Sequence, residues 1–181
     1  NKILQRYAST IALTFETSLP YFKKQAIFVG SPTMAHMYTI EDYSHLVAYL
    51  NKEKSRILDE PEYLAQLKWL FEQKGKTPIL LMSGGSQGSH FLNEQMQVIL
   101  PELLKNTIVV LQVGENEFFN DFLTLSKFLK TLPQELARNC ILRKFVYEEY
   151  GFLMKAADLF LGRSGANTVY QVGMNAVRAI F

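Results

Sequence analysis

The residues best suited to binding chemistry lie in a glycine-rich stretch that follows an apolar run. Residues 79–82 (ILLM) read as a buried strand, and a helix is expected from residue 89. Glycines there allow a tight turn and a close ligand approach, and the free N–H groups of the next helix favour a phosphate. A tight strand–helix turn without a ligand explains the stretch equally well. The stretch consists of Gly84, Gly85, Ser86, which adds a hydroxyl donor, Gln87 and Gly88.

A second turn of the same kind lies near the end of the sequence. Residues 159–161 read as a strand, and a helix is expected over 167–173. Ser164 and Thr168 are common helix-capping types, so this turn also has a purely structural explanation. Two such turns after strands of one sheet are nevertheless where open α/β sheets bind ligands. This second candidate site comprises Gly162, Arg163, Ser164, Gly165, Ala166, Asn167 and Thr168.

The elements that must position these turns alternate between strand and helix along the chain. Apolar residues switch between short continuous runs and a helical period, which is typical of βαβ units. The strands are apolar throughout, as expected when helices cover both faces of a sheet. We therefore predict an α/β fold with a Rossmann-like, doubly wound parallel sheet. Strands are expected over 10–15, 26–29, 79–82, 108–113, 141–146, 159–161 and 177–181, and helices over 19–23, 41–51, 61–74, 89–104, 117–129, 149–157 and 167–173.

Composition narrows the class of protein. The 181 residues are 48% hydrophobic and 20% charged, which is typical of a globular protein, and the net charge of +2 does not indicate a nucleic-acid partner. Cys140 is the only cysteine, so no intrachain disulfide is possible, and the three histidines lack metal-site spacing. No apolar run is long enough for a membrane span, and no signal peptide is visible. We expect no metal and no cofactor.

Two long motifs resemble one known family. The sequences GGSQGS…LN over 84–93 and KFVYEEYGFLMKAADLFLGRSGANTVYQV over 144–172 are similar to the carboxyl-terminal domain of the MurG-type UDP-N-acetylglucosamine transferases. These are family 28 glycosyltransferases of the GT-B fold. The resemblance implies that 1–32 ends an amino-terminal acceptor domain, 33–77 is a helical linker, and 78–181 is a UDP-sugar-binding domain truncated at its end. Because the chain starts at Asn1 and stops inside an apolar run, we expect a fragment.

The resemblance also implies roles for individual residues. Ser86 and the neighbouring glycines would meet the diphosphate of a UDP-sugar. Phe145 and Val146 would lie beside the uracil, with Val146 backbone groups reading its edge. The helix N-terminal amides of Ala166, Asn167 and Thr168 would face the diphosphate and the sugar.

Two positions depart from the family pattern. Gln171 replaces a glutamate that holds the ribose hydroxyls, so its hydrogen bonds lack charge assistance. Met34 stands where many members carry an arginine. Two interactions are possible for Arg163, because its guanidinium could pair with a phosphate or with Asp158.

The implied activity is inverting transfer of N-acetylglucosamine from UDP-N-acetylglucosamine to a lipid-linked muropeptide. The acceptor would lie at the inner face of the cell membrane, with the enzyme cytoplasmic and peripheral. Acceptor docking and the catalytic base would come from the missing domain, so the chain alone should bind UDP-sugar weakly at best and show no turnover. Two alternatives stay open: another UDP-sugar-dependent glycolipid synthase of the same fold, or a non-catalytic interaction module.

Several other polar and aromatic residues receive structural interpretations. His90 is expected to face solvent from a first helical turn. Glu148 and Glu149 are expected to favour the start of a helix electrostatically. The phenylalanines at helical spacing, Phe118, Phe119 and Phe122, are expected in the core, and Cys140 is expected to be an inert buried thiol.

Overall fold

The computed structural model describes residues 7–22, 26–31, 40–116 and 118–181 and consists of two compact units, Asn1–Met34 and Ala35–Phe181. In the first unit, β1 (Ile11–Leu13) pairs in parallel with β2 (Ala26–Phe28), and the 3-10 helix η2 (Glu16–Tyr21) lies between them in sequence. A strand was predicted over 10–15, and β1 confirms it for residues 11–13; its predicted burial is wrong, because only Leu13 of β1 is buried. The six residues of η2 include no buried side chain, so this helix covers little of the strand pair. Met34 lies outside the described residues.

The second unit is built on a five-stranded parallel sheet with the order β5-β4-β3-β6-β7. Numbered along the chain, this is the order 3-2-1-4-5 of a Rossmann-like sheet, and the winding direction reverses between β3 and β6. The predicted doubly wound α/β fold is confirmed. The strands are β3 (Ile79–Ser83), β4 (Ile108–Gln112), β5 (Cys140–Arg143), β6 (Leu159–Gly162) and β7 (Arg178–Ile180).

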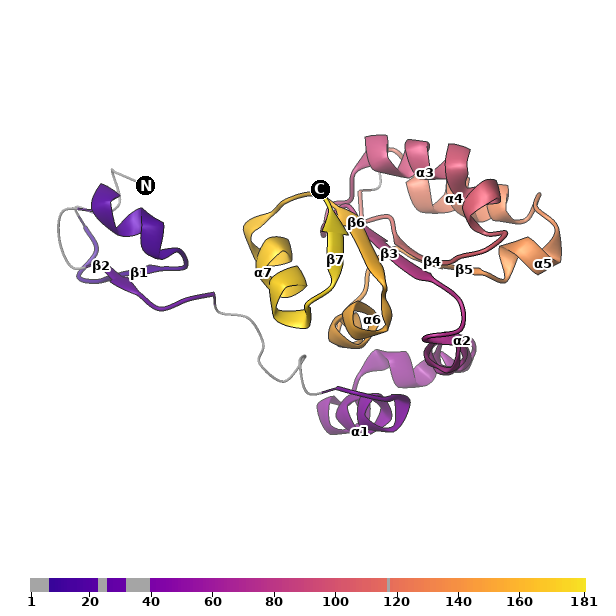
Figure 1. Cartoon of the computed structure of the whole chain (residues 1–181), viewed down its shortest axis with the longest axis horizontal. Coiled ribbons are helices and arrows are strands. Elements are labelled where there is room, and N and C mark those ends of the chain that lie inside the picture. The colour runs from indigo at the N-terminus through magenta and orange to yellow at the C-terminus, as the bar shows by residue number, and fades with distance from the viewer. Residues whose placement is uncertain (1–6, 23–25, 32–39, 117) are drawn as a thin grey trace. The chain divides into compact units, whose positions relative to one another are not determined.

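Helices cover both faces of this sheet (Figure 1). Successive β3 residues point to opposite faces, so Leu81 joins one core and Met82 another. The first core contains α1 (Tyr43–Glu53), η4 (Arg56–Asp59), α2 (Pro61–Gln73), α6 (Tyr150–Ala156) and α7 (Ala166–Asn175). The second contains α3 (His90–Leu103), α4 (Asp121–Leu129) and α5 (Gln134–Ala137).

The segment predicted as a helical linker supplies α1 and α2, which pack beneath the sheet. Leu50 of α1 and Leu67 of α2 are fully buried in the same core as Leu81 of β3. Residues 52–56 are exposed apart from Ser55, which is buried and accepts a hydrogen bond from the Ile57 amide. The buried Ile57 side chain draws this turn against the core.

Candidate functional site

The two predicted turns leave the sheet side by side. β3 and β6 are parallel neighbours, and Ser83 at the end of β3 lies opposite Gly162 at the end of β6. A methyl group placed on Gly85 would lie 3.2 Å from Nη2 of Arg163, so the two loops are in contact beyond the strands. The turns therefore flank the point where the winding reverses, which is where doubly wound sheets bind ligands.

Close packing explains part of the glycine motif. Gly88 has φ +75°, and an added Cβ would lie 1.9 Å from the Val113 carbonyl oxygen. Gly114, with φ +93°, approaches the Gly88 backbone just as closely, because a Cβ there would lie 2.2 Å from the Gly88 nitrogen. A Cβ on Gly84 would lie 2.4 Å from the Ser89 nitrogen. The first and last glycines of the motif are thus required by the fold itself.

A small polar network fixes the glycine loop from below. The buried Ser83 hydroxyl donates to Gln112 Oε1 at 3.2 Å and accepts from the Gly85 amide at 3.2 Å. Gln112 Nε2 donates to the Gly85 carbonyl at 3.3 Å, and the Glu115 amide donates to the Ser86 carbonyl at 3.1 Å. The backbone of the loop is held, while the side chains of Ser86 and Gln87 remain exposed.

Both helices that follow the turns begin without a side-chain cap. Gly165 is the N-cap of α7 and Ser89 is the N-cap of α3, and no side chain accepts a hydrogen bond from either first turn. The alternative that Ser164 or Thr168 caps α7 is therefore wrong. Gly165, Ala166 and Asn167 are exposed, so their backbone is open to a ligand. Unpaired N–H groups and the positive dipole end suit an anion at both helix starts.

The structure excludes an ion pair between Arg163 and Asp158. Asp158 lies at the start of β6 and accepts a hydrogen bond from the Ile79 amide at 2.8 Å, while Arg163 follows the other end of this strand. Within the described part of the chain, Arg163 forms no ion pair and its side chain is exposed. Its guanidinium is available to an anion beside Gly85. Gln171 lies further along α7 and is half-buried.

The two residues predicted to meet the uracil lie in the loop after β5, beyond the end of the strand. The predicted strand 141–146 is shorter, because β5 ends at Arg143. The Val146 side chain is buried in the core, which leaves only its backbone for recognition. Phe145 is half-buried, and its ring centroid lies 4.7 Å from that of Tyr147. This loop shares the carboxyl edge of the sheet but is separated from β3 by β4.

Two structural interpretations near this edge are wrong. His90 does not simply face solvent: its Nδ1 lies 2.7 Å from Asp121 of α4, and its ring stacks on Phe119 at 3.9 Å. Asn93 also donates to Asp121, so these side chains join α3 to α4. Phe118 was expected in the core but is 85% exposed, because α4 begins only at Asp121 and Phe118 lies in the preceding turn.

Sequence reasoning also missed the environment of Glu149. This carboxylate is fully buried and accepts a hydrogen bond from the Tyr63 hydroxyl at 2.8 Å. Burial raises the pKa of Glu149, and the hydrogen bonds from Tyr63 and from the Tyr147 amide oppose that shift. No local pattern could have found this contact, since Tyr63 is 86 residues away in the chain.

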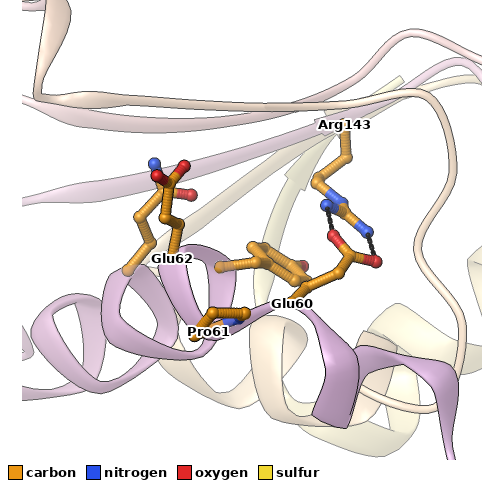
Figure 2. A pocket seen from close by; sticks show the side chains of 6 residues that line it. Glu60, Pro61, Glu62 and Arg143 are labelled. Atoms are coloured by element: carbon orange, nitrogen blue, oxygen red, sulfur yellow. Dashed lines mark hydrogen bonds and ion pairs between the residues drawn. The ribbon is translucent and has the colours of Figure 1, made fainter.

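Tyr63 also lines an open hollow of about 450 Å³, whose other lining residues include Glu60 and Arg143 (Figure 2). Arg143 and Glu60 form a two-pronged ion pair within it, and the hydrogen bond from Arg143 holds the pKa of Glu60 below its usual range. Because Arg143 is the only cation among the lining residues and is already paired with Glu60, the hollow offers no free positive charge for a phosphate. It is lined by Glu60, Pro61, Glu62, Tyr63, Gln66 and Arg143.

Other types of site find little support in the described ranges. Across these residues, His, Cys, Asp and Glu do not gather in threes as a metal site would require. Cys140 is buried, as predicted, and burial raises the pKa of its thiol to about 12. In the same residues, no helix has the length and apolar character needed to cross a bilayer.

The fold and the paired turns define a doubly wound α/β domain suited to a ligand that carries phosphate. Residues 79–181 match the glycosyltransferase family 28 C-terminal domain. The chain belongs to this family, as the resemblance of its motifs predicted.

Two curated relatives carry the name UDP-N-acetylglucosamine--N-acetylmuramyl-(pentapeptide) pyrophosphoryl-undecaprenol N-acetylglucosamine transferase. The chain is 27% identical to the protein of Exiguobacterium sibiricum over 175 residues, which cover 95% of this chain and 40% of that protein. It is 29% identical to one from Clostridium perfringens over 173 residues, covering 95% and 39%. The chain thus spans about two fifths of the length of these relatives. No solved structure shows a significant match.

Proposed function

We propose that this chain is the donor-binding part of a transferase that moves N-acetylglucosamine from UDP-N-acetylglucosamine to a lipid-linked muropeptide. The observation that supports this most directly is the pair of uncapped helix starts beside Gly85 and Arg163, which flank the winding reversal of the sheet. The names of the curated relatives specify this donor and a pyrophosphoryl-undecaprenol acceptor.

In the proposed complex, the diphosphate lies across the two turns. Backbone amides at the starts of α3 and α7 donate to its oxygens, and the exposed Arg163 guanidinium adds a charge-assisted contact. Ser86 supplies a hydroxyl donor, and Gln171 faces the ribose. As the bond from the sugar to the diphosphate breaks, negative charge grows on the departing UDP. The same amides and Arg163 then stabilise that charge, and their fixed positions hold the anomeric carbon for attack.

The acceptor side of the reaction belongs to parts of the enzyme beyond these residues. An undecaprenol-linked acceptor resides in a membrane, so the proposal includes action at the inner membrane surface from the cytoplasm. Neither a base nor an acceptor site is assigned to a residue of this chain. We therefore expect donor binding without turnover from the chain alone.

Substitutions of Gly165 test the proposal because they should change stability and binding in opposite directions. Gly165 has φ −64°, and the nearest atom to an added Cβ is Thr168 Oγ1 at 3.7 Å, so a side chain fits. Gly165→Asp supplies an N-cap and should preserve or raise stability, but its carboxylate occupies the diphosphate position and should abolish UDP binding. Gly165→Asn is the matched neutral control and should weaken binding less.

The assay is calorimetric titration of the wild-type chain and both variants with UDP, UDP-N-acetylglucosamine and UDP-galactose. A preference for UDP-N-acetylglucosamine that Gly165→Asp removes would support the proposal. A preference for UDP-galactose would instead favour another glycolipid synthase of this fold. Absence of any nucleotide binding by a folded wild-type chain would contradict donor binding and leave an interaction module.

A further inference from the structure

The segment that leads into α2 contacts the end of β5 and the loop after it, through residues that are far apart in the sequence. The Ser55 hydroxyl donates to Glu148 Oε2 at 3.0 Å, and the Tyr63 hydroxyl donates to Glu149 Oε1 at 2.8 Å. The Arg143 guanidinium carbon lies 3.8 Å from the centroid of the Tyr63 ring. The same Arg143 binds Glu60 immediately before α2 (Figure 2). Residues 55–63 therefore form one side of a clamp, and residues 143–149 form the other.

Glu149 is the centre of this clamp. One carboxylate oxygen accepts from Tyr63, and the other accepts from the Tyr147 amide at 2.8 Å. The Glu149 side chain is shielded completely from solvent, so these donors replace the water that it loses on folding. Tyr147 directly follows Val146, whose backbone is proposed to read the uracil. Glu149 thus connects a helix beneath the sheet to the loop that would hold the base.

Glu149 is the N-cap residue of α6, so the favourable effect of its charge on that helix start stays a prediction. A carboxylate that also capped the helix by hydrogen bonding would accept from amides of the first helical turn. α6 begins at Tyr150, and no side chain caps it. The Glu149 carboxylate instead accepts from Tyr147, which precedes the helix, and from Tyr63 of α2.

We propose that Glu149 is a positioning residue, which links Tyr63 of α2 to the Tyr147 amide and so holds the Phe145–Val146 backbone in a fixed geometry for a pyrimidine base. This inference rests on the proposed function, since it concerns the base of the donor. A loop whose hydrogen-bonding groups are preset binds its ligand without the cost of ordering them. Loss of the link should weaken recognition of the base while leaving the diphosphate turns intact.

The link itself can be tested without any ligand. Tyr63→Phe keeps the ring beneath Arg143 but removes the hydroxyl that donates to Glu149. Tyr21→Phe is the matched control, because Tyr21 is 72% exposed and lies in the first unit. In amide hydrogen exchange followed by NMR, Tyr147 should lose protection about tenfold in Tyr63→Phe and remain unchanged in Tyr21→Phe. Unchanged Tyr147 exchange in Tyr63→Phe would overturn the link.

Titration with UDP and with inorganic pyrophosphate tests the role in base recognition. Tyr63→Phe should weaken UDP binding about five- to tenfold and leave pyrophosphate binding unchanged. Glu149→Gln, which loses one of two acceptor oxygens, should behave similarly if it folds. Equal weakening of both ligands, or no weakening of UDP, would overturn the positioning role. A wild-type chain that binds no UDP would instead overturn the proposed function and, with it, the base-reading part of this inference.

Discussion

Replacement of Gly88 by alanine should show that part of the glycine motif is required by folding, independently of any ligand. Gly88 has φ +75°, and alanine pays about 1–2 kcal/mol in this left-handed region. An added Cβ would also lie 1.9 Å from the Val113 carbonyl oxygen, so the two backbones must separate by roughly 1 Å or more to reach normal contact. The Glu115 amide donates a hydrogen bond to the Ser86 carbonyl between the neighbouring loops. Separation of the backbones would weaken this hydrogen bond, which contributes about 1 kcal/mol.

Gly75→Ala is the matched control for the backbone contribution. Gly75 has φ +76°, but nothing lies within 4 Å of an added Cβ. We expect Gly75→Ala to cost about 1–2 kcal/mol of unfolding free energy and Gly88→Ala about 3–5 kcal/mol. The difference between the two variants measures the steric conflict alone.

Urea unfolding followed by tryptophan fluorescence provides the assay. Trp69 is the only tryptophan, and it packs against the core of the larger unit that contains both glycines. Equal losses of unfolding free energy in Gly88→Ala and Gly75→Ala would refute the reasoning, because the loops would then separate without cost. A loss of UDP binding in Gly88→Ala with no loss of stability would instead make Gly88 a ligand contact.

Three further predictions concern titration, capping and reactivity. Burial raises the pKa of Glu149 above 4.5, so the folded chain binds this proton more tightly than the unfolded chain does. The residue therefore adds stability as pH falls toward 4.5. Glu149→Gln lacks this gain, so its melting temperature should fall more steeply than that of the wild type on acidification. Arg143 lowers the pKa of Glu60, so the sign reverses and Glu60→Gln should lose stability less steeply below pH 4.5; parallel melting curves for all three chains would contradict both signs. Ala176 ends α7 with φ 51°, and Ala176→Gly should raise the unfolding free energy by about 0.5–1 kcal/mol in urea, whereas a loss would refute the strain. Cys140, whose thiol pKa is about 12, should react with a disulfide reagent only as fast as the chain unfolds.

Much of the fold was predictable because local sequence patterns indicate where its strands and turns lie. Central strands such as β3 and β4 are buried on both faces, and this leaves continuous apolar runs in the sequence. The glycines at 84–88 likewise predicted a turn between a strand and a helix, because the backbone geometry of such a turn requires glycine. Predictions failed where burial depends on neighbours: β1 has the pattern of a buried strand, but among the described residues of its unit the helix η2 buries no side chain against it.

The sequence alone determined which residues belong to each candidate turn, since turn chemistry depends on residues adjacent in the chain. Only the tertiary structure decided how those residues are used. The order of the strands places Ser83 opposite Gly162 and thereby brings the two turns together. The same packing makes Gly88 necessary for a loop crossing and joins Glu149 to Tyr63 across 86 residues. Such contacts arise from the folding of distant segments onto one sheet, and no local spacing along the chain encodes them.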